Sequence, residues 1–576
     1  MTSLNAPAWS RECDVLVLGS GAAGFAAAAT AACQGLRVLM LEKADSFGGT
    51  SAISGGAVWV YGTDQARAAG AKDSEEAMRT YLRRTIGPGY KPELVDSFIR
   101  NGHRALRWLE ANTELRYALR PHSPDYYPDE QGGTEFGRAL EMVEYDGRHL
   151  GERFRDLRMP PPGMLLFGGM MVNRVDIQHF LSFRRSPKSL WHCLKLLARY
   201  GVDRLSHHRG TRLTTGNALI ARLATTAFAK GVELWLNSEA QQLIVENGAV
   251  VGAQVLHEGR IERIRVHGGV VCAMGGFAAG KLAERFRPAS DSEHLSMSPE
   301  HNDGAALRLG EAIGAAAGEG LAANFFWAPV SELRHADGRR ERFPHLVTDR
   351  AKPGVIAVNR GGRRFVNESN SYHHFVQSMF ASGNTECWLI CDASAMNRYG
   401  LGLARPKPVD NSALVKAGYL YQADSPDALA RAIGIDAEDL RQTLERFNAN
   451  ARNGVDADFA KGGNSYNRYM GDPDHRPNPC LAPLEKAPYY AIRLHTGDLG
   501  SARGLVTDGQ ARVLGRDGQP IPGLYAAGND MNSLMDGTYP GPGITLGPGL
   551  TFAWLAANHI AARLAAPASQ QATLEH

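Results

Sequence analysis

The sequence has no CxxC pair, no CxxCH motif and no two cysteine doublets, although it contains seven cysteines. The usual patterns that attach haem or hold structural zinc are therefore excluded, and we expect no bound metal. Unpaired thiols are typical of a reducing compartment and indicate a cytoplasmic protein. Cys387 and Cys391 lie in the apolar stretch CWLIC, which predicts a buried strand.

Residues 1–14 contain no cationic segment followed by an apolar run and a cleavage site, so we expect no secretory signal. Long hydrophobic runs are also scarce. Only residues 15–32, VLVLGSGAAGFAAAATAA, approach the apolarity of a membrane span, and glycines interrupt that run after four strand-like residues. The pattern predicts a strand, a turn and a helix instead.

A chain of 576 residues is too long for one hydrophobic core, so we expect two or three folding units. Its 64 glycines indicate many tight turns or close approaches of backbone to a ligand. The net charge of +3 is unevenly distributed, because residues 151–212 hold 12 Lys and Arg against 4 Asp and Glu. This basic segment differs chemically from the rest of the chain.

The predicted strand, turn and helix carry a dinucleotide motif. Gly19, Gly21 and Gly24 form GxGxxG, which permits a tight turn, close approach of a pyrophosphate and close contact between helix and strand. A second predicted strand, VLMLEK, ends at Glu42, where a carboxylate can accept hydrogen bonds from ribose hydroxyls. Together these segments predict a dinucleotide site.

The cofactor is predicted to be FAD rather than NAD. Residues 47–59, FGGTSAISGGAVW, offer small residues against which a wide isoalloxazine ring can lie. Residues 523–530, GLYAAGND, read as a strand and a loop at the flavin ribitol, and LGPGL opens a helix near the pyrimidine edge. No second GxGxxG is present. The residues expected to bind FAD are Gly19, Gly21, Ala22, Ala23, Gly24, Glu42, Lys43, Gly49, Thr50, Ser51, Ser54, Gly55, Gly56, Ala240, Gly528, Asn529, Asp530, Gly543, Thr545 and Leu546.

A glycine- and proline-rich turn, GTYPGPGIT at residues 537–545, contains a single phenol. Such a rigid turn suits a site where backbone N–H groups and the Tyr539 hydroxyl face a ligand.

These segments resemble the FAD-dependent fumarate reductase and 3-ketosteroid dehydrogenase superfamily. Further matches are residues 301–316, 352–372 and 495–508. The resemblance implies an α/β fold, with a Rossmann-like FAD-binding domain of the glutathione-reductase type at residues 1–328 and 501–576. An α+β substrate-capping domain is expected at residues 329–500. No histidine occupies residues 50–52, where membrane-bound fumarate reductases attach FAD, so non-covalent FAD is expected.

Tyrosines distinguish the branches of this superfamily. Tyr372 and Tyr539 stand where fumarate reductases carry the arginines that clamp a dicarboxylate, and the paired-histidine segment retains only His495. The site therefore favours a neutral substrate. The motif Tyr-Pro-Gly-x-Gly, from Tyr539 to Gly543, is similar to that of 3-ketosteroid Δ1-dehydrogenases, flavoenzymes of steroid degradation and lipid metabolism.

By this resemblance the Tyr539 hydroxyl and the Gly543 N–H grip the C3 carbonyl of a 3-ketosteroid. Tyr372 is the implied base for the C2 proton, and the hydride leaves C1 for flavin N5, giving a 1,4-dien-3-one. A phenol with an ordinary pKa of about 10 needs help as a base. Residues 123–133, SPDYYPDEQGG, match the segment that supplies a supporting tyrosine, either Tyr126, which we favour, or Tyr127.

Three other functions stay open. A 3-oxo-5α-steroid 4-dehydrogenase would act at C4 and C5, a fumarate-reductase-like enzyme would reduce an enoate, and a flavin-binding protein would lack turnover. The missing arginines disfavour the second, and the presence of Tyr372, Tyr539 and Gly543 together disfavours the third. With no haem or iron–sulfur ligands, the flavin needs an external electron acceptor, for which a quinone is one candidate.

An insert at about residues 153–210 carries the excess basic charge. Leu190, Leu194, Leu197 and Ala198 repeat at helical spacing beside Trp191. An apolar stripe with flanking cations predicts a helix that lies on a membrane surface, which would place the protein on the inner face of the cytoplasmic membrane. The alternative is a helix that packs on protein or forms an oligomer contact. No nucleic-acid partner is expected, because no binding motif is present.

Overall fold

A mixed sheet with both parallel and antiparallel pairs, built from distant parts of the chain, forms one end of the molecule. The computed structural model describes residues 9–184, 186–288 and 293–566. Residues 1–8, which belong to the segment in which we expect no secretory signal, lie outside it. The strand order is β19-β20-β11-β1-β2-β8, with β10 and β9 paired onto β11. These strands are β1 (Arg11–Leu18), β2 (Val38–Leu41), β8 (Glu233–Trp235), β9 (Ser238–Glu246), β10 (Ala249–His257), β11 (Arg260–Cys272), β19 (Arg512–Leu514) and β20 (Pro520–Ala526).

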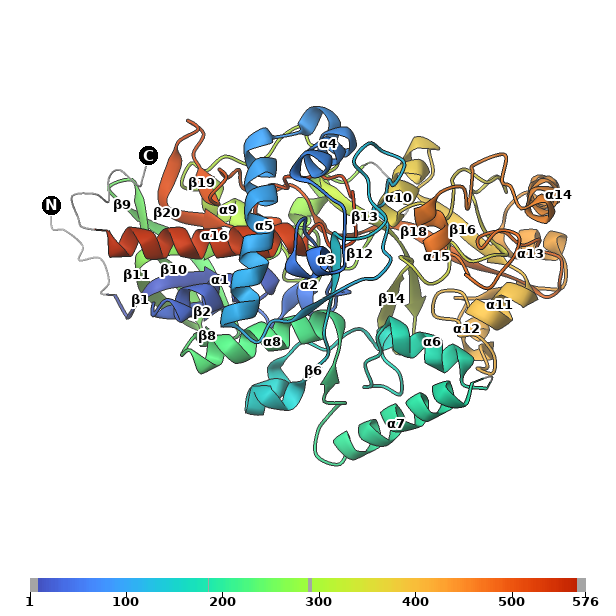
Figure 1. The fold of residues 1–576 in the computed structure, drawn as a ribbon, viewed down its shortest axis with the longest axis horizontal. Helices are drawn as coiled ribbons and strands as arrows, with labels where there is room; N and C mark the ends of the chain where they lie inside the picture. Colours follow the sequence, from blue (N-terminus) through green and yellow to red (C-terminus); the bar gives the residue numbers. More distant parts are fainter. Residues whose placement is uncertain (1–8, 185, 289–292, 567–576) are drawn as a thin grey trace.

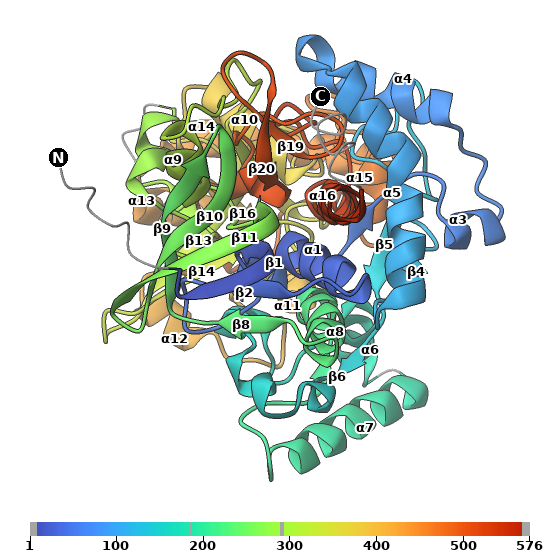
Figure 2. The ribbon, with the colours of Figure 1, turned by 90° about the vertical axis from the view of Figure 1, so that its left-hand side faces the viewer.

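Helices from both ends of the chain cover one face of this sheet. Helix α1 (Ala22–Cys33) packs against α16 (Leu546–Ala565), and α16 packs against α5 (Pro92–Asn112). Figure 2 shows α1 and α16 beside β1 and β11, with α5 on the side of these helices that faces away from the sheet. The apolar run of residues 15–32 thus forms β1 and α1, as the glycine interruption predicted. Among the described residues, no helix combines the length and apolarity needed to cross a bilayer.

A second sheet forms the other end of the molecule (Figure 1). Its order is β14-β13-β18-β16-β15, with β12 and β17 also paired to β18. The strands are β12 (Leu295–Ser296), β13 (Phe325–Arg334), β14 (Arg340–Pro344), β15 (Val355–Val358), β16 (Glu386–Cys391), β17 (Tyr421–Ala423) and β18 (Tyr489–Ser501). Helix α10 (Tyr372–Ala381) packs on β13. Helices α13 (Pro426–Ile433) and α14 (Ala437–Asn453) help to form a separate apolar core with β15, β16 and β18.

Cys387 and Cys391 lie in β16 and are fully buried, which confirms the predicted buried strand. All seven cysteines are free. The remaining elements are α2 (Gly49–Ala52), β3 (Val58–Trp59), α3 (Asp64–Ala68), α4 (Glu75–Ile86), β4 (Tyr117–Leu119), β5 (Ala139–Met142), β6 (Tyr145–Asp146), α6 (Arg174–Ser182), α7 (Pro187–Asp203), β7 (Arg212–Leu213), α8 (Thr215–Ala229), α9 (Ala305–Glu311), α11 (Ala393–Tyr399), α12 (Ser412–Lys416) and α15 (Ser465–Met470).

Buried charges hold the loop between β15 and α10. The Arg364 guanidinium lies 2.8 Å from the Glu368 carboxylate and 2.9 Å from that of Asp456. Glu368 also accepts a hydrogen bond from the Ala357 N–H in β15 at 3.0 Å. Because all three charged side chains are at most 4% exposed, each depends on its partners to replace lost hydration.

We therefore expect Arg364→Met to lower the free energy of unfolding by about 3–5 kcal/mol, since it leaves buried carboxylates short of a cation. The matched control is Arg363→Met. Its guanidinium pairs with Asp439 but is 69% exposed, and such a pair contributes about 1 kcal/mol or less. Urea unfolding of the two variants measures the difference, and equal midpoints would contradict the network's role.

Candidate active site

The glycine turn between β1 and α1 is packed too closely for side chains. Gly19 has φ +99°, and a Cβ there would lie 2.3 Å from the carbonyl oxygen of Ala273. A Cβ at Gly24 would lie 2.0 Å from the carbonyl oxygen of Gly19. The N-cap of α1 is Gly21, which provides no side-chain hydrogen bond to the helix. The turn therefore presents backbone N–H groups to an anion, as a pyrophosphate site requires.

The predicted ribose carboxylate lies directly beyond β2. Glu42 accepts hydrogen bonds from the N–H of Ser20 at 3.2 Å, from the Ser20 hydroxyl, and from the N–H of Ala44 at 2.9 Å. Lys43 pairs with Glu239 at 2.7 Å and with Asp303 at 2.9 Å. Glu42 is thus fixed beside the glycine turn.

The FGGTSAISGG segment packs against the start of α1. The Ser51 hydroxyl, in α2, accepts a hydrogen bond from the Ala22 N–H at 3.0 Å. The Thr50 hydroxyl accepts a hydrogen bond from the side-chain amide of Asn302 at 3.2 Å. The predicted residues Gly49, Ser54, Gly55, Gly56 and Ala23 lie in or beside α2 and α1, whereas Ala240 lies in β9, next to Glu239.

The C-terminal segment meets this turn from the other side. Asp530 accepts hydrogen bonds from the N–H groups of Met274 at 2.5 Å and Gly276 at 2.8 Å, and burial raises its pKa to about 6. Helix α16 begins at Leu546, and its N-cap, Thr545, makes no side-chain capping bond. A Cβ at Gly549 would lie 3.5 Å from the Cα of Gly528 and 3.9 Å from the Cβ of Ala23. The N-terminal ends of α1 and α16 therefore converge.

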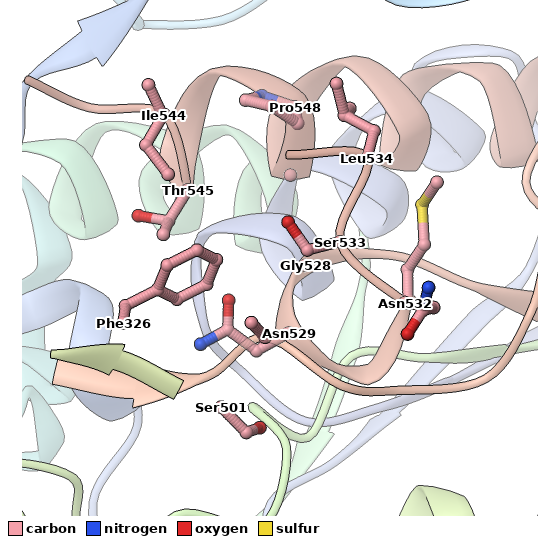
Figure 3. A pocket seen from close by; sticks show the side chains of 13 residues that line it. Phe326, Ser501, Gly528, Asn529, Asn532, Ser533, Leu534, Ile544, Thr545 and Pro548 are labelled. Atoms are coloured by element: carbon pink, nitrogen blue, oxygen red, sulfur yellow. The ribbon is translucent and has the colours of Figure 1, made fainter. Parts of the chain in front are cut away.

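A cavity lies at this convergence. Figure 3 shows Phe326, Ser501, Asn529, Ser533 and Thr545 around it. Two uncapped helix N-termini, a carboxylate beyond β2 and a cavity lined by small residues fit the anionic, ribose and ring parts of FAD. Most of the residues predicted to bind FAD lie in or beside α1, α2 and α16, whereas Ala240 lies in β9.

Three tyrosines predicted as catalytic meet beside this cavity. The hydroxyls of Tyr126 and Tyr372 are hydrogen-bonded at 3.2 Å. The Tyr539 ring stacks on Tyr126 at a centroid distance of 5.6 Å and meets Tyr372 edge-on at 5.0 Å. Tyr372 and Thr545 both act to lower the pKa of Tyr539 against the larger effect of burial, and Thr545 lines the cavity.

The turn that carries Tyr539 is anchored at Pro540. Its carbonyl oxygen accepts hydrogen bonds from the Tyr126 N–H at 2.9 Å and from the Tyr81 hydroxyl at 2.6 Å. Gly543 has φ +103°, and a Cβ there would lie 2.4 Å from the carbonyl oxygen of Ala57. The glycine and proline content of this turn thus reflects tight packing as well as the placement of the Tyr539 phenol beside the cavity.

Of the two adjacent tyrosines, Tyr126 lies in the cluster. Tyr127 instead lies beside Ser371, which acts to lower the pKa of Tyr127 against the larger effect of burial. Burial raises the pKa of Tyr126 and of Tyr372 well above the ordinary value, and raises the pKa of Tyr539. The three phenols are therefore held neutral unless a positive charge or hydrogen bond stabilises a phenolate.

The chain has close relatives of known activity. Residues 14–546 match the family described as FAD binding domain. The chain is 38% identical to 4-oxocyclohex-2-ene-1-carboxylate 5-dehydrogenase of Sinomonas cyclohexanicum over 95% of this chain and 94% of that protein. It is 35% identical to the 3-oxosteroid 1-dehydrogenase of Mycobacterium tuberculosis (strain ATCC 25618 / H37Rv), over 96% of this chain and 98% of that protein. A crystal structure of 3-ketosteroid Δ1-dehydrogenase from Sterolibacterium denitrificans, in complex with 1,4-androstadiene-3,17-dione, has a TM-score of 0.89 at 37% identity and covers 96% of this chain and 100% of that chain.

The chain belongs to the FAD-binding family that includes the 3-ketosteroid dehydrogenases. The expected fold class, the FAD cofactor and the assignment as a flavin-dependent oxidoreductase are thereby confirmed. The individual site residues remain predictions, and the geometry above is what supports them.

Sequence reasoning missed two side chains of this flavoenzyme's site. Tyr466, in α15, has its ring 4.8 Å from that of Tyr126. His373 follows the predicted base, and its Nδ1 accepts the Trp327 N–H at 3.1 Å. Burial lowers the pKa of His373 to about 3, so this histidine is neutral. The SYNRYM stretch around Tyr466 carries no motif, so only the fold brings it to the site.

We expect Gly24→Val to abolish FAD retention, because the added Cβ would overlap the Gly19 carbonyl and force α1 away from the turn. Purified wild-type protein should carry flavin absorbance that acid precipitation releases, as non-covalent binding requires. The control is Gly201→Ala in α7, where an added Cβ meets no atom within 4 Å. Undiminished flavin in Gly24→Val would contradict the assigned site.

Proposed function

We propose that this flavoenzyme introduces the C1=C2 double bond into 3-ketosteroids, converting a 3-keto-4-ene to a 1,4-dien-3-one. The observation that carries this proposal is the meeting of Tyr126, Tyr372 and Tyr539 beside the cavity at the start of α16. A dry cluster of phenols can donate to a carbonyl and remove a neighbouring proton. Identity of 35% to a 3-oxosteroid 1-dehydrogenase supports the same reaction.

The carbonyl of the substrate would be held by the Tyr539 hydroxyl and the Gly543 N–H. Both donors stabilise the enolate that develops when the C2 proton leaves. Tyr372 would take that proton, and the Tyr126 hydroxyl at 3.2 Å would stabilise the resulting phenolate charge by hydrogen bonding. Bound FAD would supply the acceptor for the hydride that leaves C1. The electrons would then pass to an external acceptor, with a quinone as our candidate.

A second candidate substrate is a 4-oxocyclohexene carboxylate, because the 38% identical relative carries that activity in its name. The bond chemistry would be the same, namely desaturation beside a ring ketone. A carboxylate, however, would require a cation facing the pocket. The guanidinium of the buried Arg350, near the cluster, donates its hydrogen bonds to four main-chain carbonyls. Because these donors are not offered to a carboxylate, we place the neutral steroid first.

We also propose the domain division expected from the sequence, with the FAD-binding domain at residues 1–328 and 501–576 and the capping domain at 329–500. The order of most strands along the chain supports it, because β13 to β18 form one sheet while β1 and β20 belong to the other. The short strand β12 departs from this division, because it precedes residue 329 and pairs with β18. The tyrosine cluster then draws Tyr372 from the cap and Tyr126 and Tyr539 from the FAD-binding domain.

The basic insert is proposed to attach the protein to a membrane surface, on the inner face of the cytoplasmic membrane. Its helix α7 lies at the periphery in both views (Figures 1 and 2). Exposed apolar side chains gather there, with Trp191 71% exposed and Leu194 49% exposed. A cationic surface with interfacial apolar groups suits an anionic lipid headgroup layer. A poorly soluble steroid could then enter from lipid.

Anaerobic mixing with androst-4-ene-3,17-dione should bleach the wild-type flavin and yield the 1,4-dien-3-one. We expect Tyr372→Phe to slow bleaching about 10²- to 10⁴-fold by removing the base, and Tyr539→Phe about 10²- to 10³-fold by removing a carbonyl donor. Tyr421→Phe is the control, because that ring packs on Trp388 in the separate apolar core. Bleaching by 4-oxocyclohex-2-ene-1-carboxylate but not by the steroid would select the second candidate.

Co-sedimentation with phosphatidylglycerol vesicles tests the attachment. We expect binding at low salt that weakens at high salt, because the basic charges are screened. The double variant Trp191→Ser, Leu194→Ser should bind less, whereas Val455→Ser, which changes an exposed valine in the cap, should not. Absence of vesicle binding together with self-association through α7 would favour the oligomer alternative.

A further inference from the structure

A buried arginine beneath the tyrosine cluster bonds only to backbone. Arg350 lies between β14 and β15 and is 3% exposed. Its Nε donates to the carbonyl oxygen of His345 at 2.7 Å, and its Nη2 to that of Leu346 at 3.2 Å. Its Nη1 donates to the carbonyl oxygens of Glu368 at 2.8 Å and Asn370 at 3.0 Å. Four neutral acceptors therefore satisfy the guanidinium.

Two of these carbonyls belong to the segment that leads into Tyr372. Glu368 and Asn370 precede Tyr372 by four and two residues, and Tyr372 is the first residue of α10. One turn further along this helix, the Phe375 ring lies 5.1 Å from the guanidinium carbon of Arg350. Arg350 is thus clamped under the first turn of α10 and fixes the position of the proposed base.

The charge of Arg350 is not neutralised by contact. Among the residues that the structure describes, Arg350 forms no ion pair, whereas the nearby Arg364 pairs with two carboxylates. Burial lowers the pKa of Arg350 below its ordinary value, but arginine remains a cation at neutral pH. The nearby carboxylates of Asp349 and Glu368 oppose this lowering without forming an ion pair with Arg350. A charge in a dry region acts on its neighbours more strongly than one in water.

Its field reaches the phenols. The positive charge of Arg350 lowers the pKa of Tyr466, against the larger opposing effect of burial, and Tyr126 in turn raises the pKa of Arg350. The Tyr466 ring contacts Tyr126 at 4.8 Å, and the Tyr126 hydroxyl is hydrogen-bonded to Tyr372. The phenols between Arg350 and the base are therefore in direct contact with one another.

We propose that Arg350 is a positioning residue for the base: its four carbonyl bonds fix Tyr372, and its positive charge, which forms no direct ion pair, favours phenolate over phenol in the tyrosine cluster. This proposal rests on the proposed desaturation. It assigns to Arg350 no contact with the substrate or the cofactor.

The other charged groups around the cluster are compensated or neutral. Arg120, which also lowers the pKa of Tyr126, lies 3.5 Å from the Glu141 carboxylate. Asp125, beside Tyr126, pairs with Arg138 at 2.8 Å. His373 is neutral, and Glu368 pairs with Arg364 and Lys461. Asp349 is hydrogen-bonded to the His345 ring and accepts hydrogen bonds from the main-chain N–H groups of Arg350 and Gly402.

The test is the pH dependence of anaerobic flavin bleaching by androst-4-ene-3,17-dione. A phenolate base gives a rate that falls as pH drops through the pKa of the base. Loss of the positive charge raises that pKa, so Arg350→Gln and Arg350→Met should move the midpoint of this acidic limb to higher pH by about one unit, a tenfold rate loss below the midpoint. Arg350→Lys should keep the midpoint and lower the rate at all pH values, because a single ammonium cannot span four carbonyls.

Arg222→Met is the matched control. Arg222 is also buried, donates to the carbonyls of Val143, Glu114 and Glu144, and lies 4.6 Å from the ring of Tyr145, away from the cluster. It should lose stability without a shift in midpoint. A second readout needs no steroid: the tyrosinate absorbance of wild type minus Tyr372→Phe should titrate at higher pH in the Arg350→Gln background.

An unshifted midpoint in a folded, FAD-containing Arg350→Gln would overturn the proposal, as would an equal shift in Arg350→Lys. Arg350→Gln keeps N–H donors for the carbonyls, so it remains the informative variant if Arg350→Met does not fold. Absence of bleaching in the wild type would instead count against the proposed function. The tyrosinate titration would then still decide whether Arg350 acts on the phenols.

Discussion

The convergence of α1 and α16 determines where every other part of the site can lie. Strand β11 pairs with β1 on one side and β20 on the other, so the two ends of the chain leave the sheet at neighbouring positions. Glycines then let the two helices approach, since a Cβ at Gly549 would lie 3.5 Å from Gly528. Both helix N-termini point their N–H groups at one region. The turn at residues 537–545 connects into α16 and is carried to the same place.

The second consequence of this close packing is dryness. Tyr126, Tyr372 and Tyr539 are each less than a tenth exposed, and burial raises the pKa of all three. Dryness strengthens a hydrogen bond to a substrate carbonyl, but it opposes the phenolate that a base requires. The site therefore needs a stabilising charge, and that charge cannot face the pocket without also attracting anions.

Local patterns predicted the parts of this site that are continuous in sequence. The GxGxxG turn, Glu42 and the Tyr539 turn are each set by spacing within a few residues, and each lies where its pattern indicated. The choice between Tyr126 and Tyr127 needed the fold, because adjacent residues in a loop differ only in direction. Tyr466 and Arg350 could not be predicted, since the tertiary fold brings them to the cluster from other segments and they carry no motif of their own.

The location of positive charge then bears on selectivity. The resemblance to fumarate reductases implies that tyrosines here replace two arginines that would otherwise offer N–H donors to a carboxylate. Arg350 keeps a guanidinium near the tyrosine cluster, but its N–H groups donate to the carbonyls of His345, Leu346, Glu368 and Asn370. Coulombic attraction to a phenolate persists at a distance, whereas recognition of a carboxylate requires direct N–H contact. A cation placed behind the phenols can thus assist the base while the pocket itself stays suited to a neutral ketone.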